Sequence, residues 1–243
     1  MHIVKCKIAD FNLDFNTDIK VLHKIMHEYL GDFEAPDISL TLSDQELEAE
    51  KLAFPGDPAR RYATTFKKTA FFRKFADRLP SRNAFVLHSA CFDVEGEGVA
   101  FAAHSGTGKT THMNLWQGLL GDKMTVVNGD KPIVRFFDDE PTTPYAYGTP
   151  WNGKERLGCN MRTKLKHICF IERSETNYVT TIEKSEAVSR LMKQVYIPKD
   201  PTALTETMQL VDRLLSCCSL WKIHCNMEKE AAEVAYNTIF NAK

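Results

Sequence analysis

The sequence predicts an α/β fold, in which a small α/β unit precedes a larger core. Segments rich in β-branched and alternating residues recur between segments whose apolar residues repeat at helical spacing. The run GVAFAA at 98–103 predicts a strand, a glycine-rich loop follows it, and 109–120 is amphipathic at the helical period. A strand, a tight loop and a helix in this order are typical of α/β proteins.

The N-terminal part predicts a strand, a helix and a second strand. Residues 2–8 and 37–42 alternate polar and apolar side chains, as half-buried strands do. Between them, 18–30 carries apolar residues at helical spacing, and Gly31 supplies a helix stop. These segments make up the small α/β unit.

A turn separates this unit from the core. Ser43 predicts the start of a short helix, because Glu46 stands three residues later, as a capping box requires. The stretch FPGDP at 54–58 has strong turn chemistry. We therefore expect a unit over 1–58 and a core over 59–243.

The core predicts strands and helices in alternation. The turn EGEG at 95–98 predicts a hairpin between the strands on either side of it. Residues 141–158 combine prolines, glycines and aromatic side chains, which favours a long ordered loop. The predicted strands are 83–94, 98–103, 124–128, 131–137, 167–172 and 221–225, and the predicted helices are 60–78, 109–120, 184–196, 203–220 and 228–241.

Composition narrows the class of function. The 243 residues carry a formal net charge of −1, so no broad positive field favours a nucleic-acid partner. The N-terminus lacks a signal-peptide pattern, and no run of about 18 apolar residues predicts a membrane span. The 7 cysteines are scattered without a C-x-x-C pair, which argues against a disulfide framework and a zinc site. Reduced thiols of this kind favour a cytoplasmic protein.

The strongest local signal is AHSGTGKTT at 103–111. Gly106 and Gly108 let backbone N–H groups approach an anion, Lys109 can reach the β- and γ-phosphates, and Thr110 can hold Mg²⁺. Ala103 stands where the usual pattern has its first glycine, and the strand before and helix after the loop supply the expected context. The plain structural alternative is a glycine-rich turn without a ligand. The predicted nucleotide-binding residues are Ser105, Gly106, Thr107, Gly108, Lys109, Thr110 and Thr111.

An acidic residue follows the next predicted strand. Asp130 comes after the apolar run at 124–127, where a phosphate loop's acidic partner usually stands. Its plain alternative is an aspartate in a Gly-Asp turn. Asp138 and Asp139 belong to an acidic turn before Pro141, and we expect them to be solvated.

These motifs resemble those of HPr kinase/phosphorylase and of the phosphoenolpyruvate carboxykinases. The resemblance covers about 83–225 and is carried by SGTGKTT at 105–111, GD at 129–130, YGTPWNG at 147–153 and WKIHCN at 221–226. It identifies the chain as similar to short HPr-kinase-like proteins. It implies a core with a mixed sheet of the HPr kinase type.

The resemblance also implies an activity and a set of site residues. It implies a kinase that uses ATP and Mg²⁺ to phosphorylate a hydroxyl, such as a serine of a protein, a peptide or the free amino acid. His88 matches the family's upstream histidine, and Asp130 matches its metal-binding or proton-accepting acid. Arg156 or Lys154 could neutralise charge on the transferred group, or could be a solvated loop charge. The resulting catalytic set is Asp130, His88, Lys109 and Arg156, and the metal ligands are Thr110 and Asp130.

Two departures keep other functions open. Larger relatives carry two adjacent acids where this chain has Asp130–Lys131, and the chain is too short for a full carboxykinase. The alternatives are a nucleotide-sensing NTPase without an acceptor, a carboxykinase-like enzyme of small molecules, and a binding module with a degenerate loop. Larger relatives assemble, so a homo-oligomer is one state that the resemblance leaves open. The sequence alone does not choose among ATP, GTP and pyrophosphate as the donor.

Overall fold

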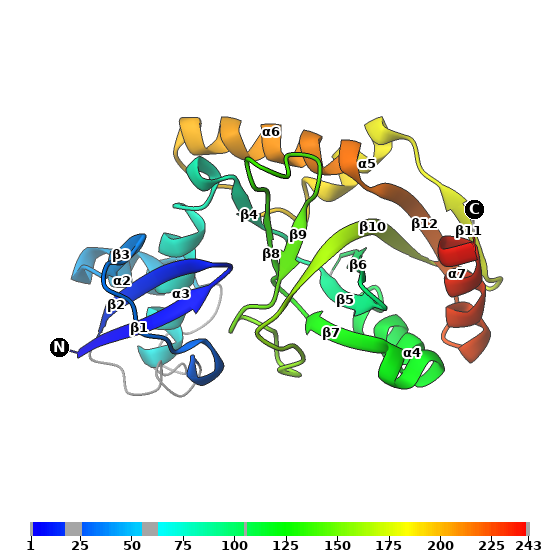
Figure 1. The fold of residues 1–243 in the computed structure, drawn as a ribbon, viewed down its shortest axis with the longest axis horizontal. Coiled ribbons are helices and arrows are strands. Elements are labelled where there is room, and N and C mark those ends of the chain that lie inside the picture. Colours follow the sequence, from blue (N-terminus) through cyan, green and yellow to red (C-terminus); the bar gives the residue numbers. More distant parts are fainter. Residues whose placement is uncertain (1, 18–25, 55–62, 105, 242–243) are drawn as a thin grey trace.

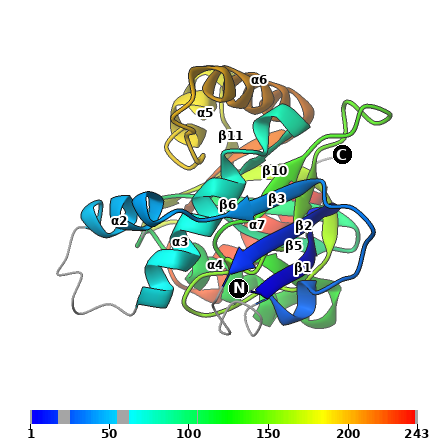
Figure 2. The same cartoon turned by 90° about the vertical axis from the view of Figure 1, so that its left-hand side faces the viewer.

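The computed structural model describes residues 2–17, 26–54, 63–104 and 106–241. Within these ranges the chain forms a three-stranded sheet and a nine-stranded sheet, and both mix parallel with antiparallel pairs (Figure 1). The predicted α/β class with a mixed sheet is confirmed. Figure 2 turns the small sheet toward the viewer.

The small sheet contains one strand that the sequence analysis missed. Strand β1 (His2–Ile8) pairs antiparallel with β2 (Phe11–Thr17), which runs parallel to β3 (Ile38–Thr41). The β1–β2 turn is the dipeptide Ala9–Asp10, with φ of 53° and 58°. Positive φ at both positions matches the twist of a tight hairpin. The predicted strands at 2–8 and 37–42 are confirmed, and the alternation in FNLDFNT was the missed signal for β2.

The expected helix at 18–30 falls largely on 18–25, which lie outside the described residues. Its described end is the 3₁₀ turn η1 (His27–Tyr29), after which Leu30 forms a bridge to Cys6. An α-helix is therefore wrong for that end. Helix α2 (Asp44–Leu52) does begin with the predicted capping box, since Ser43 and Glu46 bond to each other's backbone N–H.

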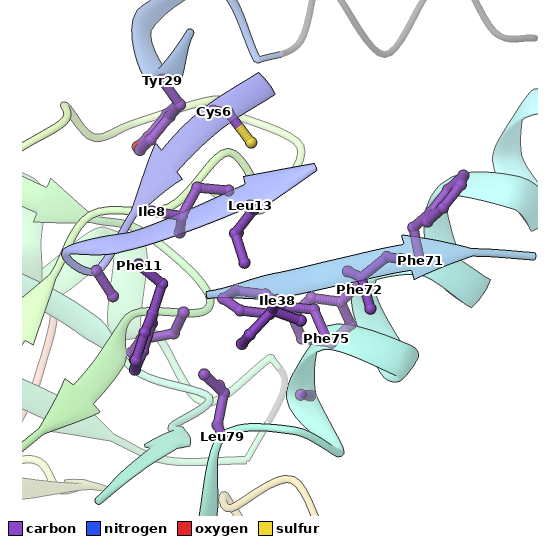
Figure 3. Close-up of a cluster of buried hydrophobic side chains, with 14 of the residues drawn as sticks. Cys6, Ile8, Phe11, Leu13, Tyr29, Ile38, Phe71, Phe72, Phe75 and Leu79 are labelled. Carbon is purple, nitrogen blue, oxygen red and sulfur yellow. The ribbon is translucent and has the colours of Figure 1, made fainter. Parts of the chain in front are cut away.

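Helix α3 (Ala63–Ala76) packs its phenylalanines against the small sheet (Figure 3). The same buried cluster continues into β4 (Ala84–Val86), β8 (Ile133–Arg135) and β9 (Tyr145–Tyr147) of the large sheet. The predicted boundary at 58 lies among 55–62, outside the described residues. The division into 1–58 and 59–243 stays a prediction, although one apolar cluster joins the two parts.

Polar contacts also join the small sheet to the large one. The Arg135 guanidinium lies 3.8 Å from the centre of the Phe11 ring and donates a 2.6 Å hydrogen bond to the Ala9 carbonyl. Asp10 accepts hydrogen bonds from the hydroxyl of Tyr147 and from Arg162. These contacts of Arg135 and Asp10 hold the β1–β2 turn against the large sheet.

Besides β4, β8 and β9, the large sheet contains β5 (Ala90–Val94), β6 (Glu97–Ala102), β7 (Met124–Asn128), β10 (Arg162–Arg173), β11 (Tyr178–Thr181) and β12 (Ser219–Cys225). The strand order is β4-β8-β9-β10-β6-β5-β7, and β12 pairs with both β10 and β11. The long strand β10 runs parallel to β6 and β12 and antiparallel to β9. Strand β10 contains the predicted strand at 167–172 and is longer than predicted, and the sequence analysis missed β11.

The predicted strand at 83–94 is wrong as a single element. The chain breaks at 87–89, so that β4 pairs with β8 while β5 pairs with β6 and β7. The break occurs because the N–H groups of Leu87, His88 and Ser89 bond to Pro132, Gln194 and Asp130, outside either strand pair. The β5–β6 hairpin, with its turn at Glu95–Gly96, is confirmed.

Helices cover both faces of the large sheet. Helices α4 (Lys109–Leu120) and α7 (Lys229–Asn241) share a buried cluster with one face. Helices α5 (Lys184–Leu191) and α6 (Pro201–Cys217) share a second cluster with the other. Helix α5 is shorter than predicted, because Val195 bridges to Leu87 and Tyr196 donates to Val86, which requires extended backbone.

Two further expectations concern the whole chain. Among the described helices, none is long and apolar enough to span a bilayer. All seven cysteines lie in the described part and are free thiols, so the expected absence of a disulfide framework agrees with the structure.

Candidate functional site

The loop 103–108 joins the end of β6 to the start of α4. Gly106 and Gly108 have φ of 80° and 118°, a backbone region that side chains other than glycine rarely adopt. Among the described residues, no atom beyond the glycine and its chain neighbours lies within 4 Å of the position that a Cβ would take at either glycine, so the backbone there has room for a ligand. Ser105 lies outside the described residues. The predicted order of strand, loop and helix is present, and phosphate binding there stays a prediction.

Lys109 opens α4 and turns its side chain back over the loop. Its Nζ donates a 2.7 Å hydrogen bond to the carbonyl of Ala103. Burial lowers the pKa of Lys109, the charge of Asp130 opposes this shift, and the charge of Lys131 adds to it. Lys109 therefore lies within the electrostatic reach of Asp130, although the two residues belong to different elements.

The loop's hydroxyl residues differ in exposure. Thr110 is half-buried and Thr111 is exposed in the first turn of α4. The N–H of Thr107 donates to the carbonyl of His104, whose side chain is exposed. The role of Thr110 as a metal ligand stays a prediction.

Asp130 stands just beyond the end of β7, between a histidine and a lysine. Its Oδ1 is 3.1 Å from Nε2 of His88, and its Oδ2 pairs with Nζ of Lys131. Burial alone would raise the pKa of Asp130, but hydrogen bonds and charges from His88 and Lys131 outweigh it and lower the pKa to about 2. Asp130 is therefore a carboxylate at neutral pH.

An asparagine shapes the turn that holds Asp130. Oδ1 of Asn128 accepts from the backbone N–H groups of Asp130 and Lys131, at 2.9 and 2.7 Å. Its Nδ2 donates to the carbonyl and hydroxyl oxygens of Thr149. Sequence reasoning missed both residues, although an asparagine before Gly-Asp is a typical signal for a side-chain-bonded turn. We call His88, Asn128, Asp130, Lys131 and Thr149 the acid corner.

His88 reaches the acid corner from the break between β4 and β5. Its backbone N–H donates a 2.6 Å bond to the carbonyl of Gln194, and the next N–H, of Ser89, bonds to the carbonyl of Asp130. The break that made the strand prediction wrong therefore places His88 beside Asp130. The predicted pair is brought together, whereas its catalytic role stays a prediction.

The segment 148–158 lies against the acid corner, and glycines permit this close approach. A Cβ at Gly148 or Gly158 would come within 2.8 Å of the carbonyl oxygen of Val127. A Cβ at Gly153, where φ is 84°, would lie 3.1 Å from Cβ of Asp130. We call residues 148–158 the glycine-clasped loop, because its backbone touches the strand end that carries Asp130.

Lys154 and Arg156 both lie on the glycine-clasped loop, and both are exposed. Arg156 has a φ of 53°, in the left-handed region. Its charge lowers the pKa of Lys68 on α3, in addition to the larger effect of burial. Lys109, by contrast, is influenced by Asp130 and Lys131. Arg156 is therefore close enough to α3 for its charge to act on Lys68.

Arg173, at the end of β10, is a second residue that sequence reasoning missed. Its Nη2 donates a 2.6 Å hydrogen bond to the carbonyl of Gly106, and its Nε a 3.4 Å bond to that of Thr107. Strand β10 runs parallel to β6, so its end reaches the loop that follows β6. Arg173 and Gly106 are 67 positions apart in the chain, and the pairing of β10 with β6 brings them together.

The other acidic candidates lie away from the acid corner. Asp138 and Asp139 are exposed, as expected, and Asp138 accepts a hydrogen bond from the side chain of Asn83. Within the described ranges no three side chains of His, Cys, Asp or Glu gather closely enough to form a metal cluster. A magnesium ion here would need oxygens from Thr110, Asp130 and the ligand itself, which suits an ion that stays bound to phosphate and water.

The chemistry available is therefore anion binding next to a fixed carboxylate. Open backbone and Lys109 can hold phosphate groups. The Asp130 carboxylate, paired with His88, can hold a metal ion or accept a hydrogen bond from a hydroxyl.

The chain was compared with protein-family models, curated proteins and solved structures. Neither the protein-family models nor the curated proteins contain a match to this chain. Among solved structures, the Hpr(Ser) kinase/phosphatase from Coxiella burnetii matches with 7% identity and a TM-score of 0.36. The match covers 65% of this chain and 97% of that one. A likeness this distant carries no information about what this chain binds.

Proposed function

We propose that this protein is an ATP-dependent phosphotransferase, similar to HPr kinase, that moves the γ-phosphoryl group to a hydroxyl of a serine-like acceptor. The observation that supports it best is the meeting of Asp130, His88 and Lys109. Asp130 is 3.1 Å from His88, and its charge acts on Lys109 at the loop. Asp130 thus contacts one predicted group and acts electrostatically on another, and the three come from separate elements.

In this proposal the loop residues bind the donor. Backbone N–H groups of the loop and the start of α4 face the phosphates, and Lys109 leaves the Ala103 carbonyl to bind the β- and γ-phosphates. Thr110 and Asp130 would hold Mg²⁺, which neutralises charge on the transferred group when it is bound. Lys131, next to Asp130, adds positive charge to the same region.

Asp130 orients the acceptor and takes its proton, together with His88. A carboxylate whose pKa is about 2 is a weak base, but it is fully ionised and accepts hydrogen bonds well. Phosphoryl transfer passes through a loose transition state, so orienting the hydroxyl and neutralising charge contribute more than early removal of the proton. The pair of His88 and Asp130 suits that task.

One observation favours a second candidate, a nucleotide-sensing NTPase without an acceptor. Both carboxylate oxygens of Asp130 already face basic side chains, His88 on one and Lys131 on the other. A carboxylate engaged in this way could act in binding alone. The switch would release free phosphate slowly and would label no hydroxyl compound.

The test is to incubate the protein with γ-labelled ATP, Mg²⁺ and candidate hydroxyl acceptors, and to identify labelled products by mass spectrometry. We expect Asp130→Asn to bind ATP within about threefold of wild type while transfer falls about 10³-fold, as for loss of a positioned catalytic group. The control is Asp139→Asn, in the exposed turn, which should transfer normally. Normal turnover by Asp130→Asn would refute the assigned role. Free phosphate without any labelled acceptor would favour the switch.

A further inference from the structure

Two cations lie on the α3 side of the site, Lys68 on α3 and Arg156 on the glycine-clasped loop, and the charge of Arg156 acts on Lys68. Lys68 is half-buried on α3, and burial followed by the charge of Arg156 lowers its pKa. Within the described part of the chain, neither side chain makes an ion pair or a hydrogen bond. Two like charges held together raise the free energy of the protein until an anion lies between them.

The geometry of α3 and the glycine-clasped loop produces this meeting. Lys68 and Phe72 are one helical turn apart, so they share a face of α3. The ring centre of Phe72 lies 4.9 Å from that of Trp151, and the ring centre of Phe75 lies 5.9 Å from it. The face that carries Lys68 is therefore the face on which the loop is anchored.

The same loop reaches Asp130 a few residues later. Gly153 lies against Asp130, and Arg156 follows Gly153 by three residues. Three residues of extended chain span at most about 10 Å. A hydroxyl at Asp130 and a second group at Lys68 and Arg156 can therefore belong to one small molecule.

The backbone at Arg156 is also unusual. Its φ of 53° costs roughly 1 kcal/mol for a residue other than glycine. Strain of this kind at a charged residue, on a loop that borders a site, is typical of a side chain held for binding. Gly153 and Gly158 supply the other positive φ angles of the loop, so the strained position is filled by an arginine where glycine would be easier.

We propose that Lys68 and Arg156 bind a carboxylate or phosphate group of the acceptor, so that the hydroxyl compound phosphorylated at Asp130 is itself a small anion. This inference rests on the proposed function and names its substrate class. Lys109 and Lys131 already supply positive charge next to Asp130, so the nucleotide phosphates do not need the second pair. Arg156 then serves to hold the acceptor instead of the transferred group.

The test uses three probes that share a hydroxyl and differ in the anion: glycerate, glycerol 3-phosphate and glycerol. Binding of each is measured by calorimetry with a non-hydrolysable ATP analogue and Mg²⁺ present, and transfer is measured with γ-labelled ATP. The variants are Lys68→Met and Arg156→Gln. Arg156→Lys keeps the charge, and Lys199→Met removes an exposed lysine elsewhere.

We expect at least one anionic probe to bind about tenfold more tightly than glycerol, the effect of one charged contact. Lys68→Met and Arg156→Gln should remove this preference, while binding of the ATP analogue stays unchanged. Arg156→Lys should keep most of it, and Lys199→Met all of it. Equal binding of the three probes, or an unchanged preference in both variants, would overturn the inference even if transfer occurs. Preferential binding without transfer would support the anion site and count against the kinase.

Discussion

The loop 103–108 and the acid corner are the two parts of the candidate site, and they are built in opposite ways. On the loop side, β6, the glycine turn and α4 follow one another within 97–120. The acid corner joins a strand break at 87–89, the turn 128–131 and the glycine-clasped loop. One side is a continuous piece of chain, and the other depends on contacts between distant segments.

Because of this difference, the two parts of the candidate site depend on different residues for their geometry. A continuous turn fixes its own backbone through glycines and a helix start, so a single residue there acts directly on the ligand. The acid corner fixes Asp130 through Asn128, His88 and the loop backbone, so residues that touch no ligand can disturb it. Variants on the two sides should therefore fail in different ways.

The largest expected effect is on the loop side. Lys109→Ala removes the cation that would bind the β- and γ-phosphates, and ATP affinity should fall at least about 100-fold, which calorimetry measures. The fold should persist, since Lys109 is bonded to one backbone carbonyl. Lys123→Ala, an exposed lysine after α4, is the matched control and should bind normally. Undiminished ATP binding by Lys109→Ala would remove the basis for a phosphate site there.

The next effect tests the acid corner through packing. A Cβ at Gly148 would lie 1.8 Å from the carbonyl oxygen of Cys159, which forces the backbone apart. Gly148→Ala should lower the free energy of unfolding by about 3 kcal/mol, measured in urea, and should reduce transfer more than ATP binding.

Gly118, within α4, gives a matched control with the opposite sign. Apart from its chain neighbours and the backbone of its own helix, no described atom lies within 4 Å of a Cβ at this position, so Gly118→Ala should stabilise the protein by about 1 kcal/mol. Equal effects of the two substitutions would show that the close approach at Gly148 does not constrain the loop.

The same contrast explains which parts of the structure the sequence predicted. The helix at 109–120, the strand at 124–128 and the capping box at Ser43 were predicted correctly, because glycine, capping and periodicity are local signals. The single strand at 83–94 was wrong, because its break is set by N–H groups that bond to Pro132, Gln194 and Asp130. Nothing within 83–94 records those partners.

The residues of the candidate site also fall into those that the sequence pointed to and those that it missed. The loop residues could be named from their pattern, and Asp130 from its place after a strand. Asn128 and Thr149 were not named, because their roles appear only when the glycine-clasped loop packs on β7. Arg173 was not named, because it reaches the loop through the pairing of β10 with β6. Sequence patterns therefore pointed to the loop and to Asp130, but not to the residues that hold them in place.

The two sides should also respond to acid in different ranges of pH. His112 on α4 is 2% exposed, and burial lowers its pKa from 6.5 to about 4. Between pH about 6.5 and 4, His112 is therefore protonated in the unfolded chain but neutral in the folded chain. This stability is present above pH about 6.5 and is lost as the pH falls toward 4. Asp130, with a pKa of about 2, loses its contribution only below pH about 4.

His112→Gln tests this separation. The amide oxygen can still accept from the indole N–H of Trp116, which now bonds to Nε2 of His112. We expect the fall in unfolding free energy between pH 7 and 4.5 to be about 2 kcal/mol smaller than in wild type. His104→Gln, at an exposed position, is the control and should keep the wild-type pH dependence. The same slope for His112→Gln and wild type would mean that His112 accepts a proton in the folded state.

The smallest effect tests whether the loop side is as self-contained as its sequence suggests. Arg173 holds the carbonyls of Gly106 and Thr107, and in a planar trans peptide the next N–H points the opposite way. The N–H of Gly108 is thereby turned away from Arg173 before any ligand arrives. Arg173→Met should weaken ATP binding about fivefold, through lost preorganisation, and should change the unfolding free energy by less than about 0.5 kcal/mol.

Arg173→Lys separates orientation from charge, because an ammonium cannot bond to both carbonyls in the planar geometry of a guanidinium. If orientation matters, Arg173→Lys should bind ATP nearly as weakly as Arg173→Met in the same calorimetric titration. If only charge matters, it should bind like wild type. Wild-type affinity in both variants would mean that the glycines and the helix start set the loop on their own, and that long-range contacts matter only at the acid corner.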